Sequence, residues 1–172
     1  MNALFVGRFQ PFHNGHLAVL EYLSKEYDQV IIGLGSSQYA GLVDNPFSAE
    51  EREQMIRESL LVKRMTNYRI VRIPDIHDPP RWVDHVLRIV SDFDVVVTNN
   101  ELTEQLFSEK GFHVEHSPLF DREQLSGESI RQRIAEGKPW ESLVPKPVLH
   151  VIEMVAGVHR IQFLMKKQKK PR

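Results

Sequence analysis

Residues 3 to 16 read Ala3-Leu4-Phe5-Val6-Gly7-Arg8-Phe9-Gln10-Pro11-Phe12-His13-Asn14-Gly15-His16, an apolar run followed by a loop rich in glycine, arginine and histidine. Leu17, Leu20 and Leu23 follow at helical spacing, so the pattern predicts a buried strand, a loop and a helix in this order. The first turn of a helix offers unpaired backbone N–H groups and the positive end of the helix dipole. We therefore interpret residues 7 to 16 as a phosphate-binding loop.

The side chains of this loop support the same interpretation. Gly7 and Gly15 would let a ligand approach the backbone closely. His13 and His16 are three residues apart, so both imidazoles can face one anion, and Arg8 can join them. Two histidines in a loop can instead be solvated or structural. Metal binding is another alternative, but no third ligand lies nearby at zinc-like spacing and the chain has no cysteine.

The composition predicts one globular domain. The chain has 172 residues, of which 41% are hydrophobic and 26% charged, enough for one sizeable core but not for a second full domain. We assign residues 1–164 to this domain and residues 165–172 to a basic, disordered tail. The lack of cysteine suits a reducing compartment, and neither a signal peptide nor a membrane-spanning run is recognisable. We expect a cytoplasmic protein with no membrane partner.

The formal net charge of -1 hides an asymmetry between the tail and the rest of the chain. Lys166, Lys167, Lys169, Lys170 and Arg172 lie in the tail, which leaves about six more acidic than basic residues in the domain. Phosphate affinity in the domain must therefore be local. Because the tail has no interleaved aromatic residues, we expect it to be solvated and expect no nucleic-acid partner.

Strand-like and helix-like segments alternate along the chain. After the first helix, strands are predicted at residues 30–35, 68–73, 95–97 and 112–115, and helices begin near Ser48, Trp82, Leu102 and Ser126. Ser48 and Glu51 form a capping-box pattern, and Ser126 is a good N-cap residue. This alternation predicts an α/β, Rossmann-like fold with a mainly parallel sheet, helices on both faces and a helical C-terminal extension.

In such a fold, ligands bind outside the carboxyl ends of the strands. The polar segments at residues 7–16, 35–45, 74–82 and 98–101 each follow a predicted strand, so we expect them to meet in one crevice. The helix that begins at Ser126-Gly127-Glu128-Ser129-Ile130-Arg131 offers a second start that can hold phosphate. Taken alone this second motif is weak, because Ser-Gly turns and surface arginines are common.

The stretch from Gly7 to His16 closely resembles the phosphate-binding signature of the nucleotidylyltransferase superfamily, and more narrowly that of the archaeal nicotinamide-nucleotide adenylyltransferases. The segment around Ser126 resembles the second signature of the superfamily. Further similar segments are Gly35-Ser36-Ser37-Gln38, Asn45-Pro46-Phe47-Ser48-Ala49-Glu50-Glu51-Arg52, Arg81-Trp82-Val83 and Pro118-Leu119-Phe120-Asp121-Arg122. The resemblance extends to about Ile161.

The resemblance implies transfer of the adenylyl group of ATP, bound with Mg²⁺, to nicotinamide mononucleotide, which forms NAD and pyrophosphate by direct in-line attack. It implies catalytic roles for His16 at the α-phosphate, His13 and Arg8 along the polyphosphate, and Arg131 at its far end. The implied ATP-binding residues are Gly7, Arg8, Phe9, His13, Gly15, His16, Ser126, Ser129, Ile130 and Arg131. The implied mononucleotide-binding residues are Trp82, Ser36, Asn45, Phe47 and Asn99, and no protein metal ligand is implied.

Trp82 would stack on the nicotinamide ring, although its spacing with Val83 and Val86 equally fits a core residue. The chain departs from the family pattern at two positions. Glu128 replaces the usual hydroxyl residue of the second signature, so either Ser129 takes over or Glu128 points outward. Asp44 stands where relatives often carry a basic residue, and Arg52 is a candidate to supply the missing phosphate contact.

Other activities remain as alternatives at this point. Enzymes with the same first signature act on phosphopantetheine, flavin mononucleotide or glycerol phosphate, and they include both adenylyl- and cytidylyltransferases. A nucleotide-binding module that has lost turnover would also fit the substitutions at Glu128 and Asp44. The family resemblance further implies a homo-oligomer, for which a hexamer is one arrangement.

Overall fold

The computed structural model describes residues 1–118 and 125–170, and its centre is a five-stranded parallel sheet in the order β3-β2-β1-β4-β5. The strands are β1 (Asn2–Gly7), β2 (Gln29–Gly35), β3 (Tyr68–Ile73), β4 (Val95–Val97) and β5 (His113–Glu115). The helices are α1 (Asn14–Glu26), α2 (Ala49–Val62), α3 (Pro79–Ile89), α4 (Glu101–Glu109), α5 (Gly127–Glu136), α6 (Lys146–Met154) and α7 (Gly157–Lys169), with a 3₁₀ turn at Glu141–Leu143. The predicted α/β fold is confirmed.

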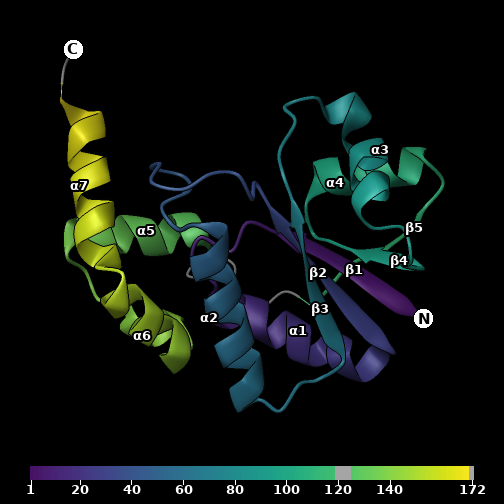
Figure 1. Cartoon of the computed structure of the whole chain (residues 1–172), viewed down its shortest axis with the longest axis horizontal. Coiled ribbons are helices and arrows are strands. Elements are labelled where there is room, and N and C mark those ends of the chain that lie inside the picture. Colours follow the sequence, from purple (N-terminus) through teal and green to yellow (C-terminus); the bar gives the residue numbers. More distant parts are fainter. Residues whose placement is uncertain (119–124, 171–172) are drawn as a thin grey trace.

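Helices cover both faces of the sheet, with α1 and α2 on one side and α3 and α4 on the other (Figure 1). Successive strand residues alternate between the two cores, as a pleated sheet requires. Ile32 packs on the α1 and α2 side, whereas Ile31 and Leu4 pack with Val86 and Phe107 of α3 and α4. Both faces of the central strands are therefore buried.

The capping patterns read from the sequence are present. Ser48 is the N-cap of α2, and its capping box with Glu51 is formed in both directions. Ser126 is the N-cap of α5, and its side chain accepts a hydrogen bond from the backbone N–H of Ser129. His13 unexpectedly caps α1, a position where Ser, Thr, Asp and Asn are usual.

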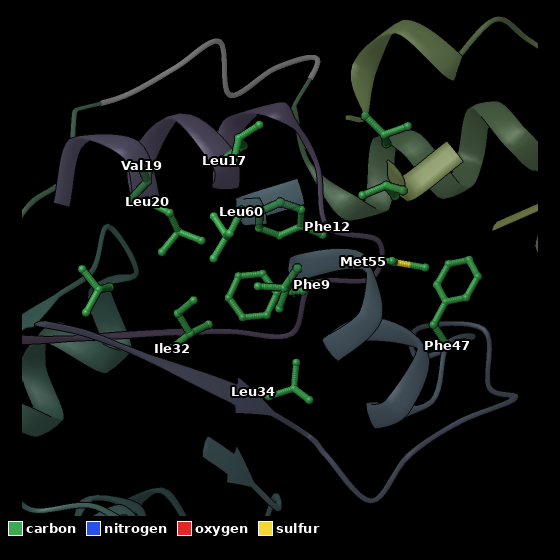
Figure 2. Packing of buried hydrophobic residues seen from close by; sticks show 14 of the residues in the cluster. Phe9, Phe12, Leu17, Val19, Leu20, Ile32, Leu34, Phe47, Met55 and Leu60 are labelled. Carbon is green, nitrogen blue, oxygen red and sulfur yellow. The ribbon is translucent and has the colours of Figure 1, made fainter. Parts of the chain in front are cut away.

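Aromatic side chains anchor the loop between β1 and α1 in the core. Phe9 and Phe12 point inward toward Ile32, Leu34 and Leu60, and both are fully buried (Figure 2). A Cβ at Gly7 would lie 2.9 Å from Cζ of Phe9. Gly7 therefore leaves room for the Phe9 ring, a packing role that the sequence did not indicate.

The C-terminal helices pack beside the sheet, with α6 against α2 and α7 against α5 (Figure 1). Helix α7 runs to Lys169, so the segment that we expected to be a disordered tail is helical from residue 165 to residue 169. The division at residue 164 stays a prediction. Within the described residues no single helix is long and apolar enough to cross a membrane. The pair α6 and α7, bent by 67° at their junction, together has the length and composition of a membrane-spanning segment.

Candidate active site

Two adjoining cavities of about 640 and 660 Å³ open at the carboxyl ends of the strands. The first cavity is lined from residues 5–19, 98–100, 117–118 and 125–131, and the second from residues 6–8, 35–36, 73–82 and 98–106. Val6, Arg8, Thr98 and Asn100 line both. The polar segments meet at one edge of the sheet as predicted, but they line two cavities rather than one crevice, and Arg8 lies between them.

The two histidines of the loop form a stacked pair in the first cavity. Their ring centroids are 3.6 Å apart at an interplanar angle of 20°. His13 Nδ1 accepts hydrogen bonds from the backbone N–H groups of Gly15 (3.1 Å) and His16 (3.3 Å). His16 Nδ1 in turn accepts the backbone N–H of His13 at 3.2 Å. Each ring therefore uses Nδ1 as an acceptor, which leaves Nε2 to carry the proton of the neutral imidazole.

Burial keeps both histidines neutral. It lowers the pKa of His13 to about 4, and burial together with the nearby His13 lowers the pKa of His16 well below its usual value. Two imidazolium rings at this stacking distance would repel each other. The imidazoles that the sequence placed beside an anion are therefore neutral, and each offers an Nε2–H donor. A Cβ at Gly15 would lie 3.0 Å from the His13 ring, so this glycine also makes room for the pair.

Arg131 brings a cation to the same cavity from α5. Its side chain is 5% exposed, Nη1 donates to the Gln10 carbonyl at 2.8 Å, and Nη2 lies 3.7 Å from Asp44 Oδ1. Within the described residues, Arg131 Nε is buried without a hydrogen-bond partner. Burial and the nearby Arg8 lower its pKa, whereas Asp44 and Glu128 act in the opposite direction. The guanidinium is therefore held in place, and its Nε–H remains a donor for a ligand.

Arg52 does not have the role that the sequence suggested. Its side chain is fully buried, and it donates to the carbonyl oxygens of Arg8 (2.9 Å), Gly35 (2.9 Å), Ser36 (3.2 Å) and Ser48 (3.2 Å). Burial lowers its pKa to about 10. Because these carbonyls use its donors, we correct the expectation that Arg52 replaces the missing phosphate contact. It instead ties the ends of β1 and β2 to α2.

The second cavity is lined by a partly exposed loop at residues 74–78 and by apolar side chains. Trp82 is partly buried, packs edge-on against Phe107 at 5.7 Å between ring centroids, and lines the cavity with Leu102 and Leu106. The indole therefore contacts the core on one side and faces the cavity on another, and its stacking on a nicotinamide ring stays a prediction. His77 of the loop has a left-handed backbone (φ 51°) and hydrogen-bonds the Tyr39 hydroxyl.

Not every residue implied by the resemblance reaches a cavity. Those that line one are Gly7, Arg8, Phe9, His13, Gly15, His16, Ser126 and Arg131, together with Ser36, Trp82 and Asn99. Those that line neither are Asn45, Phe47, Ser129 and Ile130. Phe47 and Ile130 are fully buried core residues. Asn99 lies on the side of the first cavity, where its amide donates to Ser117, rather than beside Trp82.

The two unusual acidic residues lie on the side of the first cavity. Glu128 is exposed and lines it, whereas Ser129 lines neither cavity. Asp44 is exposed and forms the ion pair with Arg131. Of the motif at residues 118–122, residues 119–122 lie outside the part of the chain that the structure describes.

Gln10 and Arg160 both bond the turn before α2, and the sequence analysis identified neither. Gln10 is 3% exposed and bonds both backbone groups of Phe47, and Arg160 of α7 bonds the Pro46 carbonyl. Gln10 lies inside the loop motif between Phe9 and Phe12. An uncharged amide between aromatic residues was the sequence feature that could have indicated a buried, hydrogen-bonded side chain. Nothing in the local sequence marks Arg160.

A parallel α/β sheet with donors at two helix starts, and with two joined cavities at its carboxyl edge, defines a nucleotide-binding protein of the doubly wound class. A family model described as cytidylyltransferase-like matches residues 4–133. Nicotinamide-nucleotide adenylyltransferase of Thermoplasma acidophilum is 43% identical over 162 residues, which cover 94% of this chain and 90% of that protein. The corresponding enzyme of Thermococcus kodakarensis is 45% identical, covering 94% of this chain and 87% of that one.

Solved structures share the fold at lower identity. A bifunctional NMN adenylyltransferase/ADP ribose pyrophosphatase from Francisella tularensis, complexed with AMP and a manganese ion, has a TM-score of 0.78 at 22% identity. The match covers 97% of this chain and 52% of that one, so this chain spans about half the length of the bifunctional protein. The chain belongs to the cytidylyltransferase-like family and, within it, to the archaeal nicotinamide-nucleotide adenylyltransferases.

Proposed function

We propose that this protein transfers the adenylyl group of ATP to nicotinamide mononucleotide and releases pyrophosphate. The observation that carries the proposal is the pair of adjoining cavities that share Arg8 in their lining, one lined by the histidine pair and Arg131 and the other by Trp82. ATP would occupy the first cavity, and the mononucleotide would place its ring beside Trp82 in the second. The two phosphate groups would then meet where Arg8, Thr98 and Asn100 line both cavities.

The chemistry needs no nucleophile from the protein. A 5′-phosphate oxygen of the mononucleotide attacks the α-phosphorus of ATP, a new P–O bond forms, and the bond to the α,β-bridging oxygen breaks. Its electrons leave with pyrophosphate. The protein brings two anions together in line and stabilises the charge that develops on the α-phosphate.

The histidine pair suits this task because its donors are fixed before ATP arrives. We propose that His16 Nε2–H donates to the α-phosphate and His13 Nε2–H to a neighbouring phosphate, with Arg131 at the far end of the chain. Since backbone N–H groups hold both Nδ1 atoms, little reorganisation is needed when charge develops. Neutral donors also make the rate insensitive to pH near neutrality.

We propose that Mg²⁺ accompanies ATP. Mg²⁺ is usually held by substrate phosphate oxygens and water with one or two carboxylates, and it neutralises charge on the phosphates. Within the described residues, no group of three or more His, Asp or Glu side chains is arranged to hold a metal.

We also propose a homo-oligomer, of which a hexamer is one form, in the cytoplasm. The exposed apolar side chains Leu61, Val62, Met154 and Phe163 on α2, α6 and α7 support subunit contacts. Light scattering after size-exclusion chromatography would test the assembly, and a monomer at micromolar concentration would contradict it.

The test of the activity is pyrophosphate release from ATP and Mg²⁺ with a panel of phosphorylated acceptors. The panel contains nicotinamide mononucleotide, nicotinate mononucleotide, phosphopantetheine, flavin mononucleotide and glycerol phosphate, with CTP as an alternative donor. We expect the highest kcat/KM with ATP and nicotinamide mononucleotide, and NAD as the product. Preferential turnover of a non-pyridine acceptor, or no turnover at all, would overturn the proposal.

A further inference from the structure

The turn before α2 is joined to the phosphate-binding loop by one side chain. Gln10 Nε2 donates to the Phe47 carbonyl and Gln10 Oε1 accepts the Phe47 N–H, both at 2.9 Å. The backbone carbonyl of Gln10 receives Arg131 Nη1 at 2.8 Å. Gln10 therefore connects the turn at residues 44–48, the loop that carries His13, and the arginine of α5.

Arg160 of α7 holds the same turn from the other side. Its Nη1 donates to the Pro46 carbonyl at 2.9 Å and to Glu51 Oε2 at 2.7 Å, and its Nη2 donates to Glu51 Oε1 at 2.9 Å. Its guanidinium carbon is also 5.8 Å from the centroid of the Phe47 ring. Bidentate geometry of this kind fixes orientation as well as charge.

The fit of α7 onto the turn is close along its first helical turn. A Cβ at Gly157 would lie 2.9 Å from Cε1 of Phe47, so only glycine allows this approach. The Glu51 carboxylate that receives Arg160 also accepts the Ser48 N–H at 2.9 Å, as part of the capping box. Burial acts to raise the pKa of Glu51, but the hydrogen bonds from Arg160 and Ser48 hold it below its usual range.

We propose that Arg160 is a positioning residue for adenylyl transfer, because it fixes the Pro46–Ser48 turn that Gln10 links to His13 and Arg131. It lines neither cavity, so it acts on the site through the turn. The kinetic part of this inference rests on the proposed function. Its structural part, the fixing of the turn, does not.

Arg72 provides a matched control, because it also bonds carboxylates of α2. Arg72 of β3 also makes two bonds to carboxylates of α2, through Nε to Glu53 Oε1 at 2.8 Å and through Nη1 to Glu50 Oε1 at 2.9 Å. These bonds join β3 to the first turns of α2 and do not involve the Pro46 carbonyl, which accepts Arg160 Nη1 and the Gly41 N–H. Loss of Arg72 removes two ion pairs of α2 and loss of Arg160 removes one bidentate ion pair with Glu51, but only loss of Arg160 also removes a bond to the turn.

The experiment compares Arg160→Ala, Arg160→Lys and Arg72→Ala by substrate kinetics, melting temperature and hydrogen exchange at the Phe47 amide. For Arg160→Ala we expect roughly a tenfold loss in kcat/KM for ATP, less than a twofold change in KM for the mononucleotide, and at least tenfold faster Phe47 exchange. Arg160→Lys should recover part of each effect, because one ammonium can still bond Glu51 or Pro46. Arg72→Ala should change neither parameter by more than about twofold.

The outcomes separate positioning from stability. Equal effects of Arg160→Ala and Arg72→Ala, or unchanged Phe47 exchange in Arg160→Ala, would overturn the inference. If Arg160→Ala does not fold, Arg160→Lys and Glu51→Gln provide milder losses of the same contacts. If the wild-type protein forms no NAD, the proposed function fails, and Phe47 exchange together with the dissociation constant for ATP still decides the role of Arg160.

Discussion

The two cavities differ in how their walls are held. In the first cavity, side chains of the phosphate-binding loop bond the backbone around them, as Gln10 and the His13–His16 pair do. In the second cavity, buried Arg52 holds Gly35 and Ser36, but the partly exposed loop at residues 74–78 is held by bonds near the surface. The exposed Gln38 bonds both backbone groups of Asp75, and the Tyr39 hydroxyl and His77 are hydrogen-bonded. A rigid wall favours stabilisation of a transition state, whereas an exposed loop can adapt to the substrate that enters. We therefore expect the first cavity to carry the chemistry of the proposed reaction and the second cavity to select the acceptor.

The largest effect is expected from His16→Ala, on the rigid side. Loss of one fixed donor at a developing charge typically costs about 2.7 to 4 kcal/mol, so kcat should fall roughly a hundred- to a thousandfold. Mononucleotide affinity should change little. Steady-state kinetics and equilibrium binding measure the two effects separately.

Unfolding of the first turn of α1 would also lower kcat, because His16 Nδ1 accepts the His13 N–H there. Circular dichroism and the melting temperature of the variant control for it. A turnover number equal to that of the wild type would refute the assignment of His16 to the α-phosphate.

A smaller effect is expected from Trp82→Ala, on the adaptable side. If the indole stacks on the nicotinamide ring, loss of about 0.5 to 2 kcal/mol raises the KM for the mononucleotide roughly two- to thirtyfold, while the KM for ATP is unchanged. Trp82→Phe should recover part of the loss. Because Trp82 also packs on Phe107, the melting temperature should fall as well.

The comparison between the cavities would break down if Trp82→Ala raised both Michaelis constants alike. Such a result would assign the indole to the core alone. Stacking, rather than core packing, also predicts that a mononucleotide lacking the pyridine ring binds the variant and the wild type equally well.

The sequence predicted local features well and distant contacts poorly. The β3 strand at Tyr68–Ile73 and the Ser48 capping box depend on side-chain period and on neighbours within one turn, and both were found as expected. Arg52 and Arg160 instead bond carbonyls far away in the chain, and no local pattern encodes such partners. The same limit applies to Phe47, whose place in a similar motif did not reveal that it is buried in the core.

A modest gain is expected from Asp44→Asn, at the outer edge of the rigid side. Asp44 is exposed and lies 3.7 Å from Arg131 Nη2, where it competes with a phosphate oxygen for that guanidinium. Exposed ion pairs are worth about 0.2 to 1 kcal/mol, so removal of the charge should lower the dissociation constant for ATP by up to about fivefold. Isothermal titration at low and high salt would measure this effect, which should shrink as salt rises. Weaker ATP binding in Asp44→Asn would show instead that the carboxylate assists the nucleotide, for example through its metal.

The smallest effect is expected from deletion of residues 166–172, which lie outside both cavities as far as the structure describes them. Lys166, Lys167, Lys169 and Lys170 are exposed. The first three lie in the last turn of α7, where positive charge interacts favourably with the helix dipole. Arg160 and the buried Ile161 remain in the truncated chain, so the contacts of α7 with the turn and with α5 are kept. We expect kcat and both Michaelis constants within about twofold of the wild type, with a slightly lower melting temperature. A large loss of activity without unfolding would mean that the basic end of α7 reaches the site of a neighbouring subunit, and mixing the truncated chain with an inactive His16→Ala chain would then restore turnover.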